Sequence, residues 1–357
     1  MNIGHGYVGA DFMSIMYLDG EELDYIWESI CKVQMVFHPR YSINGEIDFN
    51  KLLEIKSKKK VCIFLDRNLL SGLLKLCHDG YLKNEKEMRL IALLMAWALI
   101  NDFPISSGLA IKEKATNYKN LLNAKIELQD FKNIFLYYPS MLWLRLAEGN
   151  IDSIPVCKLS QKPYSTELDY TEEGDHFLMH ISEMLHVAYL NNRHELSPVE
   201  KMLDFLQWNY TNLLLCEATI VYAAMLFTNQ AGIRSPKYSG SNNIEKIFTG
   251  CKNQAWDLTY LSAWSTFHYH EDEMKDIFLF ATSDNLLQTI FINTYAEGGV
   301  NALIHSVFSQ KDYDKIVDFI MENQGENRKI PYFGTYPQEY FHRLIHDERE
   351  RIINVLN

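Results

Sequence analysis

Two short segments constrain the fold of this chain more than any other feature: VCIFLD at residues 61–66 and DIFLFAT at residues 276–282. Each is a continuous run of apolar, β-branched and aromatic residues without the alternation of a half-exposed strand. This pattern predicts a strand that is buried on both faces. Such strands are typical of parallel sheets covered by helices. We therefore expect an α/β fold with a parallel sheet.

Helical patterns occupy most of the remaining chain. The segment NEKEMRLIALLMAWALIND has apolar residues at helical spacing, with Asn84 as its N-cap. Residues 197–227 begin with a capping box and are helical in pattern throughout. FPISSGLAIKEKA predicts a short connection or strand at residues 103–105, followed by a helix that carries Glu113. Strand signals are almost absent from residue 117 to about residue 240, so this middle third predicts a helical block.

The charge balance and the missing motifs limit the function. Because 46 Asp and Glu residues outnumber 34 Lys and Arg residues, the formal net charge is −12. That excess of acid argues against generic nucleic-acid binding, which needs a basic surface. The chain has no GxxxxGKS or GxxxxGKT loop, no GxGxxG and no GxSxG, so nucleotide-driven and serine-hydrolase chemistry lack support. Without a signal-peptide pattern or a membrane-spanning apolar stretch, we expect a cytoplasmic protein with no membrane anchor.

An aspartate follows each predicted strand: Asp66 ends the first, and Asp284 comes shortly after the second. In an open parallel sheet the ligand site lies beyond the carboxyl ends of the strands, so both carboxylates are expected at the same edge. Two carboxylates held close together repel each other unless a cation lies between them. A strand-terminal Asp is also a common helix N-cap. The pair together favours a site for a divalent metal.

With these aspartates, the sequence resembles the PIN-domain nuclease superfamily. Four segments match in the family's order: IFLDRNLL at 63–70, ISSGLAIKE at 105–113, AWDLTYLSAWS at 255–265 and FLFATSDNLL at 278–287. The resemblance implies a PIN-like parallel β-sheet core flanked by helices. It implies a cluster of four acidic metal ligands, namely Asp66, Glu113, Asp257 and Asp284. It also implies that Asn68 and Thr282 orient these ligands, with Ser283 as a secondary candidate.

The resemblance divides the chain into a core and additions. Residues 61–114 and 244–292 would form the PIN-like core, with a helical insertion at 115–243, an N-terminal extension at 1–60 and a C-terminal helical extension at 293–357. The long insertion leaves the alignment of Glu113 open. Glu217, in the apolar segment LLLCEATIVYAA, competes with it, because a buried carboxylate is costly unless it is paired or bound to metal.

The acid cluster implies a metal-dependent endonuclease that hydrolyses phosphodiester bonds, and the resemblance favours RNA over DNA. Carboxylate oxygens select Mg²⁺ or Mn²⁺, and two such ions can activate water and stabilise the leaving oxygen. Phosphate contacts would come from Arg67, Arg234 and Lys237. The lysines at positions 56, 58, 59 and 60 precede the first strand at the opposite edge, and we expect them to face solvent.

The resemblance implies a toxin, phage-defence or RNA-processing role. It leaves room for an inhibitor or partner protein and for a homo-oligomer, and it implies no membrane partner. The alternative is a catalytically silent PIN-like protein whose helical insertion acts as a protein-interaction module. A phosphatase of the haloacid-dehalogenase type is disfavoured, because it needs a second Asp where this chain has Asn68.

Two further groups of histidines and acids are interpreted as structural. His176, His180, Glu183 and His186 share a broad helix face but lack the adjacent Glu of the HExxH metalloproteases, so we expect exposed or hydrogen-bonded histidines. FHYHEDE at residues 267–273 is expected to form a surface turn at a helix end.

Overall fold

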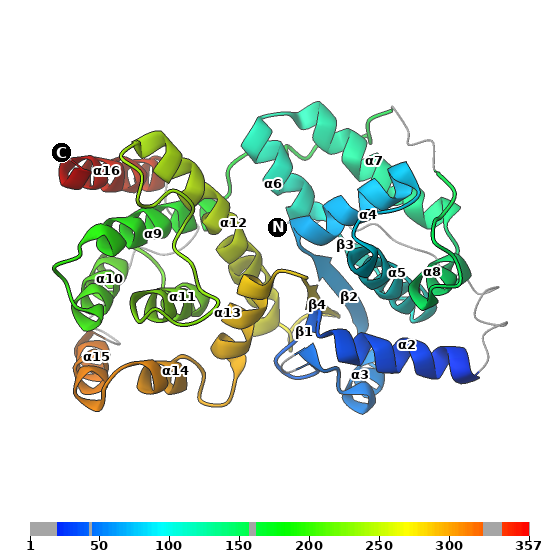
Figure 1. The fold of residues 1–357 in the computed structure, drawn as a ribbon, viewed down its shortest axis with the longest axis horizontal. Coiled ribbons are helices and arrows are strands. Elements are labelled where there is room, and N and C mark those ends of the chain that lie inside the picture. Colours follow the sequence, from blue (N-terminus) through cyan, green and yellow to red (C-terminus); the bar gives the residue numbers. More distant parts are fainter. Residues whose placement is uncertain (1–19, 43–44, 157–161, 324–337, 357) are drawn as a thin grey trace. The chain divides into compact units, whose positions relative to one another are not determined.

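Figure 1 shows the fold in the computed structural model, which describes residues 20–42, 45–156, 162–323 and 338–356. The chain forms two compact units, and each is described by itself. Unit 1 comprises the residues up to 172 together with residues 264–284, and unit 2 comprises residues 173–263 and those from 285 onward. Each unit is therefore assembled from two segments that are distant in the sequence.

Unit 1 contains a four-stranded sheet with the strand order β1-β4-β2-β3. The central strands β2 (Lys60–Leu65) and β4 (Asp276–Ala281) are parallel and paired along their whole length. β3 (Ile105–Ser106) lies parallel to β2 on its other side. Every residue of β2 and β4 after the first is buried. The prediction of two buried, parallel strands is thus confirmed.

β1 (Val36–Phe37) has no counterpart in the sequence prediction. It pairs antiparallel with β4, with Val36 opposite Ala281. A strand of two residues is too short to show any periodicity in the sequence. The helices α2 (Gly20–Val33) and α3 (Phe49–Lys56) precede and follow it along the chain. The segment expected to be an N-terminal extension therefore supplies an edge strand of the sheet.

The other helices that lie entirely in unit 1 follow β2 and β3 in sequence: α4 (Arg67–Asp79), α5 (Glu85–Ile100), α6 (Gly108–Tyr118), α7 (Leu121–Tyr137) and α8 (Ser140–Glu148). The side chain of Asn84 caps α5 as predicted, by accepting a hydrogen bond from the backbone N–H of Glu87. Residues 91–100 of α5 are all buried, and the helix packs against α2, α4 and α8. α5 is therefore part of the hydrophobic core of unit 1.

The described part of unit 2 is helical, with α9 (Asp175–Asn192), α10 (Pro198–Asn212), α11 (Glu217–Phe227), α13 (Asn285–Tyr295), α14 (Gly299–Val307), α15 (Gln310–Asn323) and α16 (Gln338–Leu356). The predicted capping box at Ser197 is present. The single helical stretch expected for residues 197–227 is wrong, because Leu213 is extended and separates α10 from α11.

α12 (Ile244–Tyr269) belongs to both units, with residues 244–263 in unit 2 and 264–269 in unit 1. In unit 1 the ring of Phe267 packs against Phe64 of β2 and Phe278 of β4. The indole N–H of Trp264 donates to the Phe278 carbonyl at 2.7 Å. These contacts fix the last turns of α12 on the sheet.

The units cut across the predicted segments. The expected insertion at 115–243 contributes α7 and α8 to unit 1 and α9 to α11 to unit 2. The second part of the expected core, 244–292, also contributes to both units. In the part of the chain that the structure describes, we find no helix with the length and apolar character to span a bilayer.

Candidate functional site

Asp66 lies at the carboxyl end of the central strand β2, where the chain enters α4. It is the N-cap of α4, and its Oδ1 accepts a hydrogen bond from the backbone N–H of Leu69 at 2.8 Å. The residue is only 1% exposed. The capping role expected for a strand-terminal Asp is therefore present, but it accounts for one carboxylate oxygen only.

The second oxygen of Asp66 faces the end of β4. It accepts a hydrogen bond from the hydroxyl of Thr282 at 2.5 Å, and the same hydroxyl oxygen accepts from the backbone N–H of Asp284 at 3.0 Å. Leu65 and Ala281 are the last paired residues of the two strands, so Asp66 and Thr282 leave the sheet side by side. The fully buried Thr282 thus connects the side chain of Asp66 to the backbone of Asp284, the second aspartate that follows a strand.

Two further acids of unit 1 act on Asp66 at this edge of the sheet. The pKa of Asp66 is raised to about 7, mainly by burial and in smaller part by the charges of Asp284 and Glu113, against the opposing effect of the hydrogen bonds from Thr282 and Leu69. Glu113 is half-buried on α6, which follows β3, and Asp284 is half-buried after β4. Both of these strands lie in the same sheet as β2. The topology therefore collects the three acids at the carboxyl edge.

The ligand atoms of Asp66, Glu113 and Asp284 do not all lie within 4.8 Å of one another. Among the described residues, one set of three His, Cys, Asp or Glu side chains has all of its ligand atoms within 4.8 Å of one another, and that set is His38, His268 and Glu271. A two-ion site spreads its ligands, because the ions themselves lie about 3.5–4 Å apart. The hard oxygens of Asp66, Glu113 and Asp284 fit Mg²⁺ or Mn²⁺ in their ligand chemistry.

The other two acidic candidates belong to unit 2. Asp257 is half-buried on α12 and accepts a hydrogen bond from Gln254 Nε2 at 3.1 Å. Its convergence with the acids of unit 1 stays a prediction. The prediction that Glu217 is a buried carboxylate is wrong, because this residue is exposed at the first position of α11. An acid there interacts favourably with the helix N-terminus and needs no metal.

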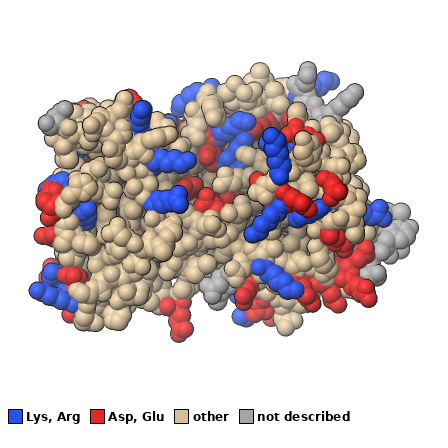
Figure 2. Space-filling model, in the orientation of Figure 1, with Lys and Arg blue, Asp and Glu red and all other residues tan. Residues whose placement is uncertain are grey.

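Arg67, expected to contact phosphate, is held by another side chain. Its guanidinium pairs with both carboxylate oxygens of Glu127, at 2.9 and 3.1 Å, and Lys114 pairs with the same carboxylate. Figure 2 shows acidic and basic side chains interspersed over α4, α6 and α7 in this region. The remaining polar candidates are all exposed, Asn68 and Ser283 in unit 1, Arg234 and Lys237 in unit 2.

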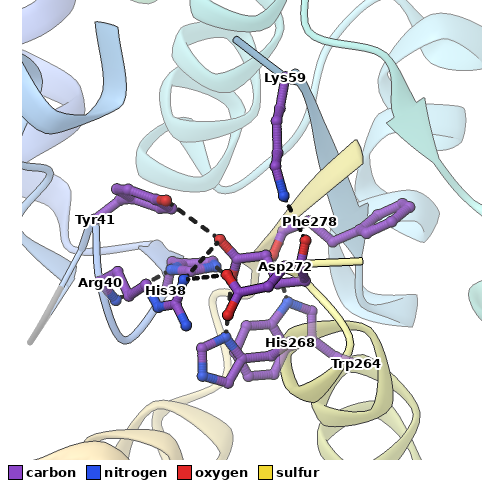
Figure 3. Close-up of polar contacts among 9 residues, drawn as sticks. His38, Arg40, Tyr41, Lys59, Trp264, His268, Asp272 and Phe278 are labelled. Carbon is purple, nitrogen blue, oxygen red and sulfur yellow. Dashed lines mark hydrogen bonds and ion pairs between the residues drawn. The ribbon is translucent and has the colours of Figure 1, made fainter. Parts of the chain in front are cut away.

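Unit 1 contains a buried polar cluster that the sequence did not predict (Figure 3). Glu271, in the turn between α12 and β4, is 3% exposed. Its Oε2 lies 3.2 Å from His38 Nε2 and 3.1 Å from His268 Nδ1, and its Oε1 accepts a hydrogen bond from the Tyr41 hydroxyl at 3.2 Å. The expectation of a surface turn at 267–273 is therefore wrong for Glu271. Its partners His38 and Tyr41 are distant in the sequence, so no local pattern reveals them.

The hydrogen bonds of this cluster oppose a metal ion among the three side chains. The backbone N–H of Arg40 donates to His38 Nδ1 at 3.1 Å. A neutral imidazole has one donor and one acceptor nitrogen, so His38 Nε2 carries the proton and donates to Glu271. Metal at Nε2 would require the opposite tautomer. Burial lowers the pKa of His38, which keeps its ring neutral. We interpret the cluster as an anchor for the turn before β4.

Of the histidines of α9, His180 and His186 are buried and His176 is half-buried. His180, Glu183 and His186 have no exposed surface. His180 Nδ1 lies 2.6 Å from Glu183 Oε2, and its Nε2 lies 2.8 Å from Ser262 Oγ. This order resembles the hydrogen-bond chain of a serine hydrolase, but the hydroxyl is buried within α12 and is shared with His176 Nδ1 at 3.0 Å. The hydrogen-bonded part of the prediction is confirmed, and the network has a structural role.

Comparison with protein-family models, curated proteins and solved structures gives no match to this chain. The functional interpretation therefore depends on the geometry at the carboxyl edge of the sheet.

Proposed function

We propose that this protein is a PIN-like, metal-dependent endonuclease whose acids lie at the carboxyl edge of the sheet in unit 1, with RNA as the preferred substrate. The hydrogen bonds from the Asp66 carboxylate through Thr282 to the backbone of Asp284, together with the effect of Asp284 and Glu113 on Asp66, support the proposal most. A buried acid whose pKa is raised in part by two further acids is costly, and such arrangements cluster at functional sites. This activity suits a toxin, phage-defence or RNA-processing protein of the cytoplasm.

Asp66, Glu113 and Asp284 would hold Mg²⁺ or Mn²⁺. The ions would supply activation of water and stabilisation of the leaving oxygen. The protein's own contribution is orientation. The cap of α4 fixes one oxygen of Asp66, and the Thr282 hydroxyl fixes the other. The buried strands β2 and β4 give these side chains the rigid support that a catalytic site needs.

The test is cleavage of a labelled single-stranded RNA by the wild type and by Asp284→Asn, with Mg²⁺ and with EDTA. The substitution keeps the shape of the side chain, and the backbone N–H of residue 284 still donates to Thr282. We expect the variant to cleave roughly 100-fold more slowly or worse, because even the outer partners of metal ligands contribute 10–100-fold. EDTA should abolish cleavage by the wild type.

Asp24→Asn is the matched control, because it removes the same charge from an exposed position on α2. It should cleave like the wild type. Equal cleavage by the wild type and Asp284→Asn would indicate a contaminating nuclease and refute the proposal. A DNA of the same base sequence tests the preference for RNA.

A further inference from the structure

Five lysines gather at the opposite edge of the sheet from the acids. Lys56 ends α3, Lys58, Lys59 and Lys60 lead into β2, and Lys275 directly precedes β4. Because β2 and β4 pair from their first residues, the backbone N–H of Lys60 donates to the carbonyl of Lys275 at 3.2 Å. The parallel pairing therefore brings together cations from two segments that are distant in the sequence.

These lysines line an open depression of about 520 Å³, together with Ser57 and Met274. We call it the lysine depression. Lys58 pairs with Glu54 at 2.6 Å, but both side chains are more than 60% exposed, and such surface pairs contribute little. Lys59 Nζ donates to the backbone carbonyl of Glu271 at 2.5 Å, a partner without net charge (Figure 3). Five of the seven residues that line the depression are lysines, so its lining is rich in positive charge, although the chain has a net charge of −12.

The segments around the lysine depression are held in place by the buried cluster. The carboxylate of Glu271 lies against His38 and His268, while its backbone carbonyl accepts from Lys59. Glu271 thus ties the turn that leads to Lys275 to the segment that leads into β2. A basic surface on a fixed backbone loses less entropy on binding an anion than a mobile one.

We propose that the lysine depression binds the phosphate backbone of single-stranded RNA at a distance from the cleavage site. This inference rests on the proposed function, which makes RNA the polyanion that unit 1 handles. The six residues of β2 separate the lysines from Asp66 by about 20 Å at roughly 3.3 Å per residue. Nucleotides stacked as in one strand of a duplex rise about 3.4 Å each, so an RNA strand of that geometry needs about six nucleotides to reach both edges.

The test measures binding of a fluorescent RNA by anisotropy, in EDTA and at several salt concentrations. The RNA has about 20 nucleotides, which is more than one small binding site covers. The variant combines Lys58→Gln, Lys60→Gln and Lys275→Gln, which are all exposed. The logarithm of the affinity falls linearly with the logarithm of the salt concentration, and each lost phosphate contact makes this slope shallower by about 0.7 for a single strand. We expect the slope to become shallower by about 2. The affinity at low salt should fall about tenfold or more.

The matched control combines Lys32→Gln, Lys83→Gln and Lys86→Gln, exposed lysines elsewhere in unit 1. It removes the same charge and should leave the slope nearly unchanged. Equal losses in the two triple variants would overturn the proposal, because net charge alone would explain them. Lysine-dependent binding of poly-glutamate without binding of RNA would also overturn the proposal. That result would indicate that the lysine depression binds an acidic protein instead.

Cleavage of a trinucleotide separates this proposal from the proposed nuclease activity. The variant with three substituted lysines should cleave the trinucleotide like the wild type, because so short a substrate does not reach the lysine depression. Selective loss of trinucleotide cleavage in that variant would overturn the binding role. If the wild type cleaves nothing and still binds RNA through the lysines, the nuclease proposal fails and the binding proposal is supported.

Discussion

At the scale of single residues, Asp66 caps a helix, but its ionised form lowers the stability of the folded protein. It caps α4 and accepts a hydrogen bond from Thr282, but burial and two neighbouring acids raise its pKa from 3.8 to about 7. At about 1.4 kcal/mol per pKa unit, ionisation of this group in the folded protein opposes folding by about 4 kcal/mol. Such a cost is characteristic of sites kept for function rather than for stability.

Asp66→Asn should therefore stabilise the protein at about pH 8 and have little effect at about pH 4. Between pH 3.8 and about 7 the folded state holds a proton that the unfolded state has released. Wild-type stability attributable to this group falls as pH rises through that window and is constant above it. Asn does not ionise, and its amide oxygen still accepts the cap hydrogen bond.

Chemical denaturation in EDTA at several pH values checks this prediction, with Asp24→Asn as the control. A variant that is less stable than the wild type at about pH 8 would contradict the pKa assignment of Asp66.

Thr282→Val tests the hydroxyl that joins the two aspartates. Its loss leaves one oxygen of Asp66 without this donor in a buried site, so we expect a loss of about 1–3 kcal/mol in the free energy of unfolding. Thr282→Ser keeps the hydroxyl and is the matched control, with a smaller loss. Urea denaturation measures both. A Thr282→Val variant as stable as the wild type would contradict a role for the hydroxyl, and a larger loss in Thr282→Ser than in Thr282→Val would assign the effect to the methyl group.

At the scale of secondary-structure elements, a buried ion pair connects α16 to α9. His186 Nδ1 lies 2.8 Å from Glu348 Oε2 of α16, and its Nε2 lies 3.3 Å from Asp204 of α10. Arg351 Nε lies 3.5 Å from the other oxygen of Glu348. Although burial opposes it, the two neighbouring carboxylates raise the pKa of His186 above its ordinary value. The imidazolium therefore links three helices.

Glu348→Gln should cost about 3–5 kcal/mol at slightly acidic pH, as is usual when one partner of a buried pair is removed. The pKa of His186 is raised, so its contribution is complete below pH 6.5 and is lost as pH rises through the folded-state pKa. The deficit of the variant should therefore shrink in alkaline solution. Denaturation of the full chain across pH measures it. Glu350→Gln, exposed on the same helix, is the control, and identical pH profiles for the two variants would argue against the pair.

Elements with a strong local pattern are predictable from this sequence, and elements defined by their partners are not. β2, β4 and α5 have continuous apolar runs or caps, and the structure places them where the sequence does. β1 exists through its pairing with β4, and the break before α11 follows no Gly or Pro. The environment of Glu271 likewise depends on His38, which is distant in the sequence.

At the scale of the whole molecule, the average charge conceals local contrasts. Figure 2 shows acidic side chains gathered around α2, where Glu21 and Glu22 lie in the first turn. One strand, β2, starts at Lys60 in the lysine depression and is followed by Asp66 at the acidic edge. The net charge argues against nucleic-acid binding by the surface as a whole. It does not argue against binding at the lysine depression.

The contact between Asp66 and Thr282 joins residues 216 positions apart, and this has a consequence for synthesis of the protein. At about 5–20 residues per second, a ribosome finishes β2 roughly 10–45 s before β4 emerges. During that interval β2 has β3 as a partner but lacks β4, and the three acids of unit 1 are not yet together. The nuclease that we propose would thus stay inactive in a nascent chain until most of the chain had been made, which would delay cleavage of RNA near the ribosome.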